Sequence, residues 1–406
     1  MSGFFRSRWV PRPAHTKQLA RTALPAGFRA AGVAAGIKGE GVDVGVLVSD
    51  DPETVSAARF STNARLGAPV IVSKQADLAG LRAIAANSGC SNVGDGLRGL
   101  ETAQAMQQAA ADKLGLKPAQ VGVASTGPIG LELPRDRVVE GVRAACDELA
   151  PDAASLSEAI LTSDSAPKRA CLEVQLADGP VRLAAQAKGA GMIEPRFATM
   201  FCFIQTDAGL SAESLELLTG VCVKRSFDRI SVDGQLSTSD TVFAMANGVS
   251  CVLIEPESDD ELRFGEAMDA LLRQLALEIV ADGEGARRVG RIVVNGRPDA
   301  VEPVARSIAN SPLVKAALHG GDPNLGRILQ AAGQVWPPGE PFLADLEIEG
   351  LQVVSAGEVV EAPTTELVSG AEVEYVLTMP GEGGETEVFF SDLSPEYASY
   401  NSAYLS

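Results

Sequence analysis

The pattern of hydrophobic and polar positions along the chain predicts a mixture of helices and strands. Apolar residues recur at helical spacing over residues 99–114, directly before Gly115, and the same period over residues 262–280 predicts a long amphipathic helix. Short apolar runs bounded by glycine and polar residues predict strands, and a glycine-rich acidic segment predicts an exposed hairpin turn. The strands are predicted at residues 42–48, 121–124, 291–294 and 344–354, and the hairpin turn at residues 382–387.

These elements do not alternate regularly between strand and helix, so the pattern argues against a doubly wound parallel sheet. A mixed α/β (α+β) fold is expected instead. With 406 residues, the chain exceeds the size at which a single hydrophobic core usually stops growing, roughly 250–300 residues, and two lobes are expected.

Composition narrows the class of protein. Hydrophobic residues make up 46% and charged residues 21% of the chain, which is typical of a folded globular protein. No apolar run reaches the ~18 residues of a membrane span, and no secretory signal peptide is recognised. The six cysteines form no C-x-x-C pair, so neither a zinc site nor a disulfide framework is indicated, and a cytoplasmic location is expected.

Charge excludes one class of partner. The net charge of −19 disfavours nucleic acid, because phosphate binding needs clustered lysine and arginine. Residues 1–198 carry 22 basic and 20 acidic side chains, whereas the remainder carries 12 and 33. This asymmetry fits either a solvated acidic surface or mutual recognition of two segments.

The N-terminal region has its own composition. Residues 1–38 contain seven lysines and arginines and no acidic residue. An organellar transit peptide has this profile, but Pro11 and Pro13 would interrupt an amphipathic helix, and the alternative is a disordered or loosely docked arm. Ordered sequence is expected to begin near Gly27, after a basic extension at residues 1–26.

The densest group of turn-forming residues lies at residues 188–208, where Thr199 opens an apolar run. If the bond between Ala198 and Thr199 were cut, the new α-amine, with a reference pKa near ~7.7–8, could act as base for the hydroxyl of Thr199. With only two histidines in the chain, a Ser-His-Asp triad is hard to assemble. From the local pattern alone, the alternative that Thr199 is a structural residue at the start of a strand stays open.

Three further segments have both a chemical and a structural interpretation. Residues 125–127, Ser-Thr-Gly after a predicted strand, fit either an oxyanion hole or an ordinary turn. The glycine-containing residues 320–327 lack the Lys-Ser/Thr of a phosphate-binding loop and favour a structural corner. The oxygen-rich residues 232–241 do not have EF-hand spacing, so we expect a hydrogen-bonded loop near the site and no metal.

Several segments together resemble the glutamate/ornithine N-acetyltransferase family of arginine biosynthesis. They follow one another in order from about Gly27 to the C-terminus, which is far more specific than any one motif. The matching segments are AGVAAGIK (31–38), VLVSDDPETVSAARFSTN (46–63), NSG (87–89), STGPIG (125–130), AILTSDSAPK (159–168), KGAGMIEPRFATM (188–200), VDGQLSTSDT (232–241), DGEGA (282–286), NSPLVKAALHGGDPNLGR (310–327) and YNSAY (400–404).

The resemblance implies a two-lobed N-terminal-nucleophile acetyltransferase fold, similar to the DmpA/ornithine acetyltransferase type. It implies self-cleavage into an α chain (27–198) and a β chain (199–406), and acetyl transfer from N2-acetylornithine to glutamate through an acetyl-Thr199 ester. Thr126 and Gly127 would form the oxyanion hole. No cofactor is implied, acetyl-CoA is a further candidate donor, and two α and two β chains would assemble. The implied substrate-binding residues are Thr162, Lys188, Thr199, Glu284, Asn401 and Ser406.

Two other functions remain open from the sequence. One is an N-terminal-nucleophile aminopeptidase or amidase of related fold, in which water resolves the acyl-threonine. The other is an uncleaved binding protein or amino-acid sensor on the same scaffold.

Overall fold

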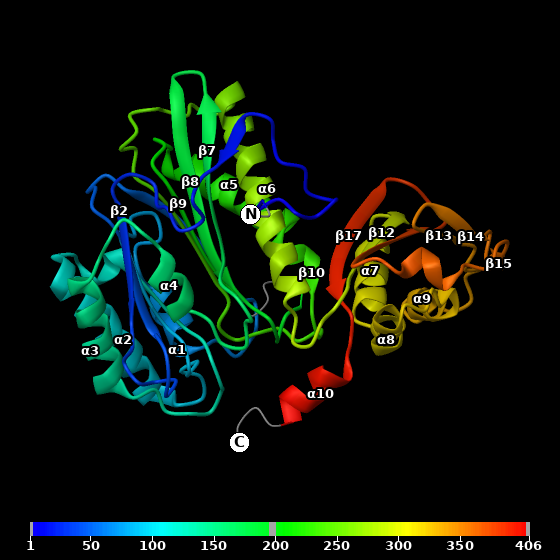
Figure 1. The fold of residues 1–406 in the computed structure, drawn as a ribbon, viewed down its shortest axis with the longest axis horizontal. Helices are drawn as coiled ribbons and strands as arrows, with labels where there is room; N and C mark the ends of the chain where they lie inside the picture. Colours follow the sequence, from blue (N-terminus) through cyan, green and yellow to red (C-terminus); the bar gives the residue numbers. More distant parts are fainter. Residues whose placement is uncertain (1–2, 195–199, 403–406) are drawn as a thin grey trace. The chain divides into compact units, whose positions relative to one another are not determined.

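The computed structural model describes residues 3–194 and 200–402, which divide into two compact units (Figure 1). The described residues of the first unit fall within Met1–Gly189, Arg196–Asp228 and Leu236–Ala276, and those of the second within Ala190–Pro195, Arg229–Gln235 and Leu277–Ser406. Each unit has its own sheets and its own buried core, which confirms the two expected lobes.

The first unit contains a six-stranded sheet in the order β1-β7-β8-β9-β11-β4. β9 and β11 pair in parallel, and the other neighbours are antiparallel. All six residues of both β9 and β11 are buried, as expected for central strands covered on both faces. The strands are β1 (Thr16–Gln18), β4 (Val55–Phe60), β7 (Lys168–Leu176), β8 (Gly179–Lys188), β9 (Phe201–Thr206) and β11 (Thr241–Ala246).

A four-stranded sheet in the order β2-β3-β5-β6 is the second layer of this unit. One of its faces packs against the six-stranded sheet through a core that includes Phe28, Ile84, Phe203 and Phe243. The other face is covered by two helices, as Figure 1 shows. The strands are β2 (Phe28–Val33), β3 (Val44–Ser49), β5 (Ala83–Asn87) and β6 (Val121–Ser125), and the helices are α2 (Gly96–Leu114) and α3 (Arg135–Asp147).

The remaining helices of the first unit complete its layers. α5 packs on the six-stranded sheet, where Arg59 of β4 donates to the Glu216 carboxylate at 2.7 Å. α6 packs on α5, with Arg225 Nε donating to Asp269 Oδ1 at 2.8 Å. These elements are α1 (Ala68–Ser73), α4 (Ala154–Ala159), α5 (Ala212–Arg225), α6 (Asp259–Ala281), and the 3-10 turns η1 (Pro118–Gln120) and η2 (Phe227–Arg229).

The second unit is built on a seven-stranded sheet in the order β10-β17-β12-β16-β13-β14-β15. Its core lies between the sheet and the helices α7, α8 and α9. The strands are β10 (Ile230–Ser231), β12 (Val289–Gly296), β13 (Asp345–Ile348), β14 (Leu351–Ser355), β15 (Glu358–Val359), β16 (Glu372–Thr378) and β17 (Gly384–Ser391). The helices are α7 (Val301–Ala309), α8 (Pro312–Gly320), α9 (Leu325–Gly333), α10 (Pro395–Ser402) and the 3-10 turn η3 (Thr365–Val368).

Most of the predicted elements are confirmed. The helix predicted over residues 99–114 is α2, which ends where Gly115 adopts φ 67°, a left-handed conformation that favours glycine. The long helix over residues 262–280 is α6, and the runs at 42–48, 121–124 and 291–294 form β3, β6 and β12. All three sheets are mixed or antiparallel in part, so the class is mixed α/β and not doubly wound.

Two predictions in the second unit are wrong. Residues 344–354 form two strands, because Glu349 and Gly350 both take positive φ and turn the chain between β13 and β14. The segment at 382–387 is exposed near Glu382 but is not a hairpin turn. Residues 379–383 connect β16 to β17, residues 384–387 already belong to β17, and β12 lies between these two strands.

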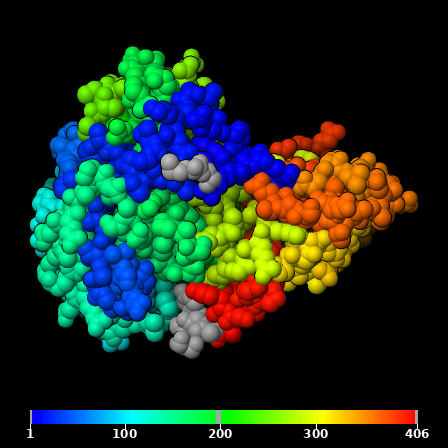
Figure 2. Space-filling view, viewed as in Figure 1, coloured from blue at the N-terminus to red at the C-terminus, as the bar shows by residue number. Residues whose placement is uncertain are grey.

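The expectation that ordered structure begins near Gly27 is also wrong. Phe4 is completely buried, its N–H donates to Gln18 Oε1 at 2.8 Å, and the N–H of Arg6 donates to Gln274 of α6 at 3.3 Å. Strand β1 pairs with β7, and Figure 2 shows the N-terminal residues, in dark blue, as part of the surface of the first unit. The described part of this segment is therefore an integral layer of the unit.

No helix in the described ranges is both long and apolar enough to cross a lipid bilayer.

Candidate functional site

Lys188, the last residue of β8, joins two other residues that the sequence marked as functional. Its side chain is 1% exposed, and Nζ donates to Thr126 Oγ1 at 3.1 Å and to Thr162 Oγ1 at 2.8 Å. Thr126 follows β6, and Thr162 lies beyond α4, so the two sheets of the first unit bring these segments together. The structure thus brings Thr126, Thr162 and Lys188 together.

Asp164 links this lysine to a second one. Its Oδ1 accepts from Lys168 Nζ at 2.7 Å and from the N–H of Gly189 at 2.6 Å, and Oδ2 accepts from the N–H of Thr162 at 3.1 Å. Burial opposes ionisation of Asp164, but Lys188, Lys168 and the hydrogen bonds outweigh it and lower its pKa to about 2. The Asp164 carboxylate therefore acts on both lysines, and Lys188 places an ammonium group beside Thr126.

The sequence interpretation gave no role to Asp164 or Lys168. Both belong to the segment AILTSDSAPK (159–168) that carried part of the resemblance, and their separation is four residues. This spacing was the one sign in the sequence that the two residues could pair, and the fold shows the ion pair itself.

In the turn after β6, the two donors of Thr126 differ in availability. The backbone N–H of Thr126 is already used, because it donates to the carbonyl oxygen of Asn87 at 3.0 Å. Its hydroxyl, in contrast, accepts from Lys188 and so keeps its own proton for donation to another acceptor. Any contribution of Thr126 to oxyanion binding must therefore come from the side chain.

Gly127 occupies a position that excludes other residues. Its φ is +135°, and a Cβ built there would lie 2.6 Å from Cys90 N and 2.7 Å from Gly89 C. Both neighbours are backbone atoms, so a side chain could be accommodated only if the turn moved. Glycine therefore keeps the turn close to residues 89 and 90.

Asp240, directly before β11, contacts the first described residue after Thr199. The carboxyl group is fully buried, and Oδ1 accepts from the N–H of Met200 at 3.1 Å. Burial raises the pKa of Asp240 well above its ordinary value, although the Met200 N–H, Ser237 and Lys188 act in the opposite direction. Oδ2 has no hydrogen-bond partner within residues 3–194 and 200–402.

The loop before Asp240 is held by hydrogen bonds, as predicted. Asn63 Nδ2 donates to the carbonyl oxygen of Leu236 at 2.8 Å, and the N–H of Gly67 donates to that of Thr238 at 2.9 Å. Ser61 Oγ donates to the carbonyl oxygen of Ser237. These bonds fix the approach of the chain to β11.

In the second unit, Glu284 and Asn401 lie in direct contact. Asn401 Nδ2, on α10, donates to Glu284 Oε2 at 2.7 Å, and the N–H of Glu284 donates to the carbonyl oxygen of Ala190 at 3.0 Å. A Cβ on Gly191 would lie 2.5 Å from Glu284 Oε1, so glycine is needed for this close approach. The structure thus brings together two more of the predicted site residues.

Asp233 holds the same region of the second unit. It accepts from the N–H groups of Met192 and Ile193 at 2.7 and 2.8 Å, and Tyr397 OH donates to it at 3.3 Å. Burial raises its pKa against the effect of these backbone bonds and of Lys315. Asp233 therefore connects the segment at 190–194 to α10, which carries Asn401.

The other predictions have different outcomes. Ala198, Thr199 and Ser406 lie outside the described residues. The segment at 320–327 is a structural corner, because Gly321 ends α8 with φ 65° and Asn324 caps α9 by accepting from the N–H of Arg327.

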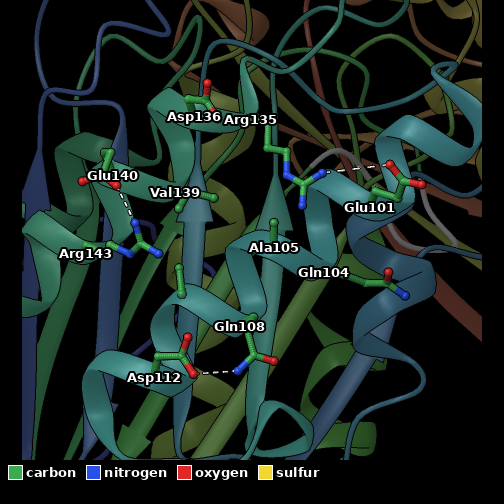
Figure 3. Close-up of a pocket in the computed structure, with 11 residues that line it drawn as sticks. Glu101, Gln104, Ala105, Gln108, Asp112, Arg135, Asp136, Val139, Glu140 and Arg143 are labelled. Atoms are coloured by element: carbon green, nitrogen blue, oxygen red, sulfur yellow. Dashed lines mark hydrogen bonds and ion pairs between the residues drawn. The ribbon is translucent and has the colours of Figure 1, made fainter.

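A groove of 650 Å³ lies elsewhere on the first unit, between α2 and α3 (Figure 3). Four of its charged side chains form ion pairs: Arg143 with Glu140 at 2.5 Å, and Arg135 with Glu101 at 4.0 Å. None of the predicted site residues lines this groove, so we do not assign it to the chemistry.

The fold and the site define a mixed α/β protein whose first unit holds a buried lysine, Lys188, against the threonine that follows β6. Comparison with known proteins adds the family: a model described as the ArgJ family matches residues 29–406, and the chain belongs to this family.

Individual relatives agree. The arginine biosynthesis bifunctional protein ArgJ of Symbiobacterium thermophilum is 39% identical over 391 residues, covering 94% of this chain and 97% of the relative. The protein of the same name from Streptococcus thermophilus is 37% identical over 392 residues, covering 94% and 98%. The solved ornithine acetyltransferase from Mycobacterium tuberculosis, complexed with ornithine, is 33% identical, covers 44% of this chain and 98% of its own, and has a TM-score of 0.41.

Proposed function

We propose that this protein transfers an acetyl group from N2-acetylornithine to L-glutamate through an ester on Thr199, giving ornithine and N-acetylglutamate. Family membership supports the type of reaction. The observation that carries the proposal is the bond of Lys188 to Thr126 and Thr162, because it holds a buried ammonium group beside the turn that follows β6.

Each group has a role that its contacts support. The hydroxyl of Thr126 and the N–H of Gly127 stabilise the oxyanion, and the ammonium of Lys188 polarises that hydroxyl further. Lys188 also attracts a substrate carboxylate, with Thr162 as hydrogen-bond partner. The Glu284 carboxylate binds a substrate amino group, and Asn401 orients it. Ser406 completes the proposed substrate-binding residues.

Self-cleavage precedes the reaction: one water hydrolyses the bond between Ala198 and Thr199, which leaves a carboxylate on Ala198 and frees the α-amine of Thr199. This amine takes the hydroxyl proton of Thr199 while Oγ1 bonds to the acetyl carbonyl carbon of N2-acetylornithine. The tetrahedral intermediate collapses, the C–N bond breaks, and the proton passes to the nitrogen of departing ornithine. Glutamate then attacks the ester through its amino group and leaves as N-acetylglutamate, which restores the threonine.

The first test separates transfer from hydrolysis. Acetylornithine consumption is followed with and without glutamate, and N-acetylglutamate is quantified by mass spectrometry. We expect consumption to require an acceptor amine. Equal consumption without glutamate would instead support the alternative, an aminopeptidase or amidase in which water resolves the acyl-threonine.

The second test concerns Thr199. The wild-type protein should give two bands on denaturing electrophoresis, each near half of 42.1 kDa. Thr199→Ala should remain one full-length band without transferase activity, whereas Thr199→Ser, which keeps a hydroxyl, should retain cleavage. An active Thr199→Ala protein would refute the nucleophile, and an inactive uncleaved wild type would favour an amino-acid sensor.

Three further points complete the proposal. Acetyl-CoA is a second candidate donor to glutamate, which a direct comparison with acetylornithine will decide. Two α and two β chains form the proposed assembly. The cytoplasm is the proposed location, supported by six cysteines that are all free thiols in the described chain.

A further inference from the structure

The backbone of Lys38, in the segment that joins β2 to β3, is held by a buried carboxylate. Asp43 is completely buried, and its Oδ2 accepts from the N–H of Ile37 at 2.5 Å and from that of Lys38 at 3.0 Å. Its Oδ1 accepts from the N–H of Ala35 at 2.7 Å. These three bonds fix the point from which the side chain of Lys38 extends.

The side chain of Lys38 contacts both segments that carry the candidate site in the first unit. A Cβ built on Gly89 would lie 2.7 Å from Lys38 Cγ, so the stem of the lysine packs on the residue that the turn at Gly127 approaches. At its other end, Nζ donates to the carbonyl oxygen of Leu161 at 3.0 Å. Leu161 directly precedes Thr162, one of the predicted substrate-binding residues. The ammonium group of Lys38 therefore lies next to that residue.

This ammonium group has no counter-ion among the described residues. A lysine ammonium has three donors, and within those residues Lys38 uses one, in its bond to Leu161. Asp43 and Asp164 attract it electrostatically, but both carboxylates are hydrogen-bonded to other donors. Because Lys38 is half-buried, loss of hydration lowers its pKa against these two attractions. A bound anion would supply the counter-ion and engage the two remaining donors.

The two proposed substrates differ in the charge of their side chains. N2-acetylornithine ends in an ammonium group, which Glu284 is proposed to bind, whereas glutamate ends in a carboxylate, which Glu284 would repel. Lys188 can bind the α-carboxylate that both molecules share. A second cation is therefore needed for the side-chain carboxylate of glutamate. Lys168 is already engaged by Asp164, which leaves Lys38 as the lysine beside Thr162 that can meet this need.

We propose that Lys38 is a specificity-determining residue for the acyl acceptor, whose ammonium group binds the side-chain carboxylate of glutamate. This inference rests on the proposed function and names the group that recognises the acceptor. Lys38 bonds to residue 161 and Lys188 to residue 162, so the two lysines together match a dicarboxylate. An acceptor of the same length without the second negative charge would leave Lys38 without its counter-ion and be rejected.

The test measures kcat/KM for glutamate and for glutamine as acceptors, with acetylornithine as donor, in wild type and in Lys38→Met. Glutamine has the length and shape of glutamate without the side-chain charge, and methionine keeps much of the apolar stem of lysine. Wild type should prefer glutamate by about 10- to 100-fold, which is the effect of one hydrogen bond to a charged group. Lys38→Met should lower kcat/KM for glutamate by a similar factor and leave that for glutamine nearly unchanged.

An exchange reaction separates recognition from a structural role. Labelled ornithine is incorporated into acetylornithine through the donor half of the reaction, in which no side-chain carboxylate takes part. Lys38→Met should keep the wild-type exchange rate, and Lys38→Arg, which retains the positive charge, should keep a preference for glutamate. If Lys38 only held residue 161 in place, exchange and both acceptors would weaken together in Lys38→Met, and that result would overturn the proposal.

Lys113→Met is the matched control. Lys113 lies on α2 in the same unit, and its ammonium group pairs with Asp147 of α3 at 2.7 Å. The substitution removes the same charge from the chain but from the helical layer. It should leave both the preference for glutamate and the exchange rate unchanged, whereas an equal loss of preference would show that net charge, and not Lys38, selects glutamate.

Each other outcome decides the matter. A folded Lys38→Met protein that prefers glutamate as strongly as wild type overturns the proposal, and so does a wild type that uses both acceptors equally well. If Lys38→Met does not fold, reductive methylation of Lys38 in wild type is followed by mass spectrometry. Glutamate should protect this lysine more than glutamine does, and equal protection rejects the assignment. A wild type that transfers acetyl to no acceptor would refute the proposed function instead.

Discussion

Substitution of Gly127 by alanine tests the turn that the proposed mechanism needs. The residue has φ +135°, and holding a non-glycine residue there costs about 1–3 kcal/mol. The new Cβ would also lie 2.6 Å from Cys90 N and 2.7 Å from Gly89 C. Overpacking against backbone adds about 1–3 kcal/mol. Gly127→Ala should therefore destabilise the first unit by about 2–6 kcal/mol.

Gly130→Ala is the matched comparison on the same turn. Gly130 also has positive φ, at +86°, but no atom lies within 4 Å of a Cβ built there. This variant therefore includes the backbone strain without the steric contact. The difference between the two alanine variants isolates the contact with residues 89 and 90.

The two tryptophans, Trp9 and Trp336, lie in different units, so fluorescence can report on each unit. In a Trp336→Phe background, urea unfolding followed by Trp9 gives the stability of the first unit. If the turn shifts to relieve the contact, the Gly127 N–H moves as well, and kcat should fall about 10²- to 10³-fold. Equal stability and equal kcat in Gly127→Ala and Gly130→Ala would refute the steric argument.

Two further predictions concern the two cores. Phe4→Ala should lower the free energy of unfolding of the first unit by about 3–5 kcal/mol, because Phe4 is fully buried. Substitution of the exposed Arg12 by alanine should change this free energy by less than about 0.5 kcal/mol. Trp9 fluorescence reports both variants, and equal effects would argue that the N-terminal segment is only loosely docked. In the second unit, burial lowers the pKa of Lys315 to about 7 against an ordinary 10.5. Between these two pH values, Lys315 is protonated in the unfolded chain but neutral in the folded chain. The free energy of unfolding should therefore rise with pH by up to about 1.4 kcal/mol per pH unit from pH 7 to 9. Lys315→Met should abolish this rise when unfolding is followed by Trp336 fluorescence.

The elements that the sequence predicted well are those whose signal is local. The helix α2 shows its period and its terminal glycine within 20 residues, and strand β3 is buried at all six positions. The segment 344–354 failed because its apolar positions are compatible with one strand or two. The turn at Glu349 depends on a positive φ, which the alternation of apolar and polar residues does not reveal.

The N-terminal segment failed for the opposite reason. Its basic composition argued for a loosely docked arm. Phe4 is nevertheless buried, and Gln274 of α6, far along the chain, accepts a hydrogen bond from the backbone N–H of Arg6. Composition describes average solubility, whereas docking depends on a few apolar side chains and on a surface that exists only after the rest of the unit has folded.

The residues of the candidate site also divide into those that the sequence predicted and those that it missed. Thr126, Thr162 and Lys188 were predicted through the resemblance, and the structure joins them. Asp164, Lys168 and Asp240 received no role, because the function of a carboxylate depends on the charges buried with it. Two lysines hold Asp164 ionised, whereas Asp240 is buried without a hydrogen-bonded cation in the described residues.

The register of β9 explains how a cleaved chain could keep its nucleophile in position. β9 lies between β8 and β11, with Phe201 paired to Lys188 on one side and to Thr241 on the other. Cleavage before Thr199 would cut the connection from β8 but none of these strand pairings. The new terminus would therefore begin two residues before a strand that is anchored on both edges. A slip of one residue would turn every side chain of β9 to the other face and bury the wrong set, so the packing of Phe201 and Phe203 in the core fixes the register of β9.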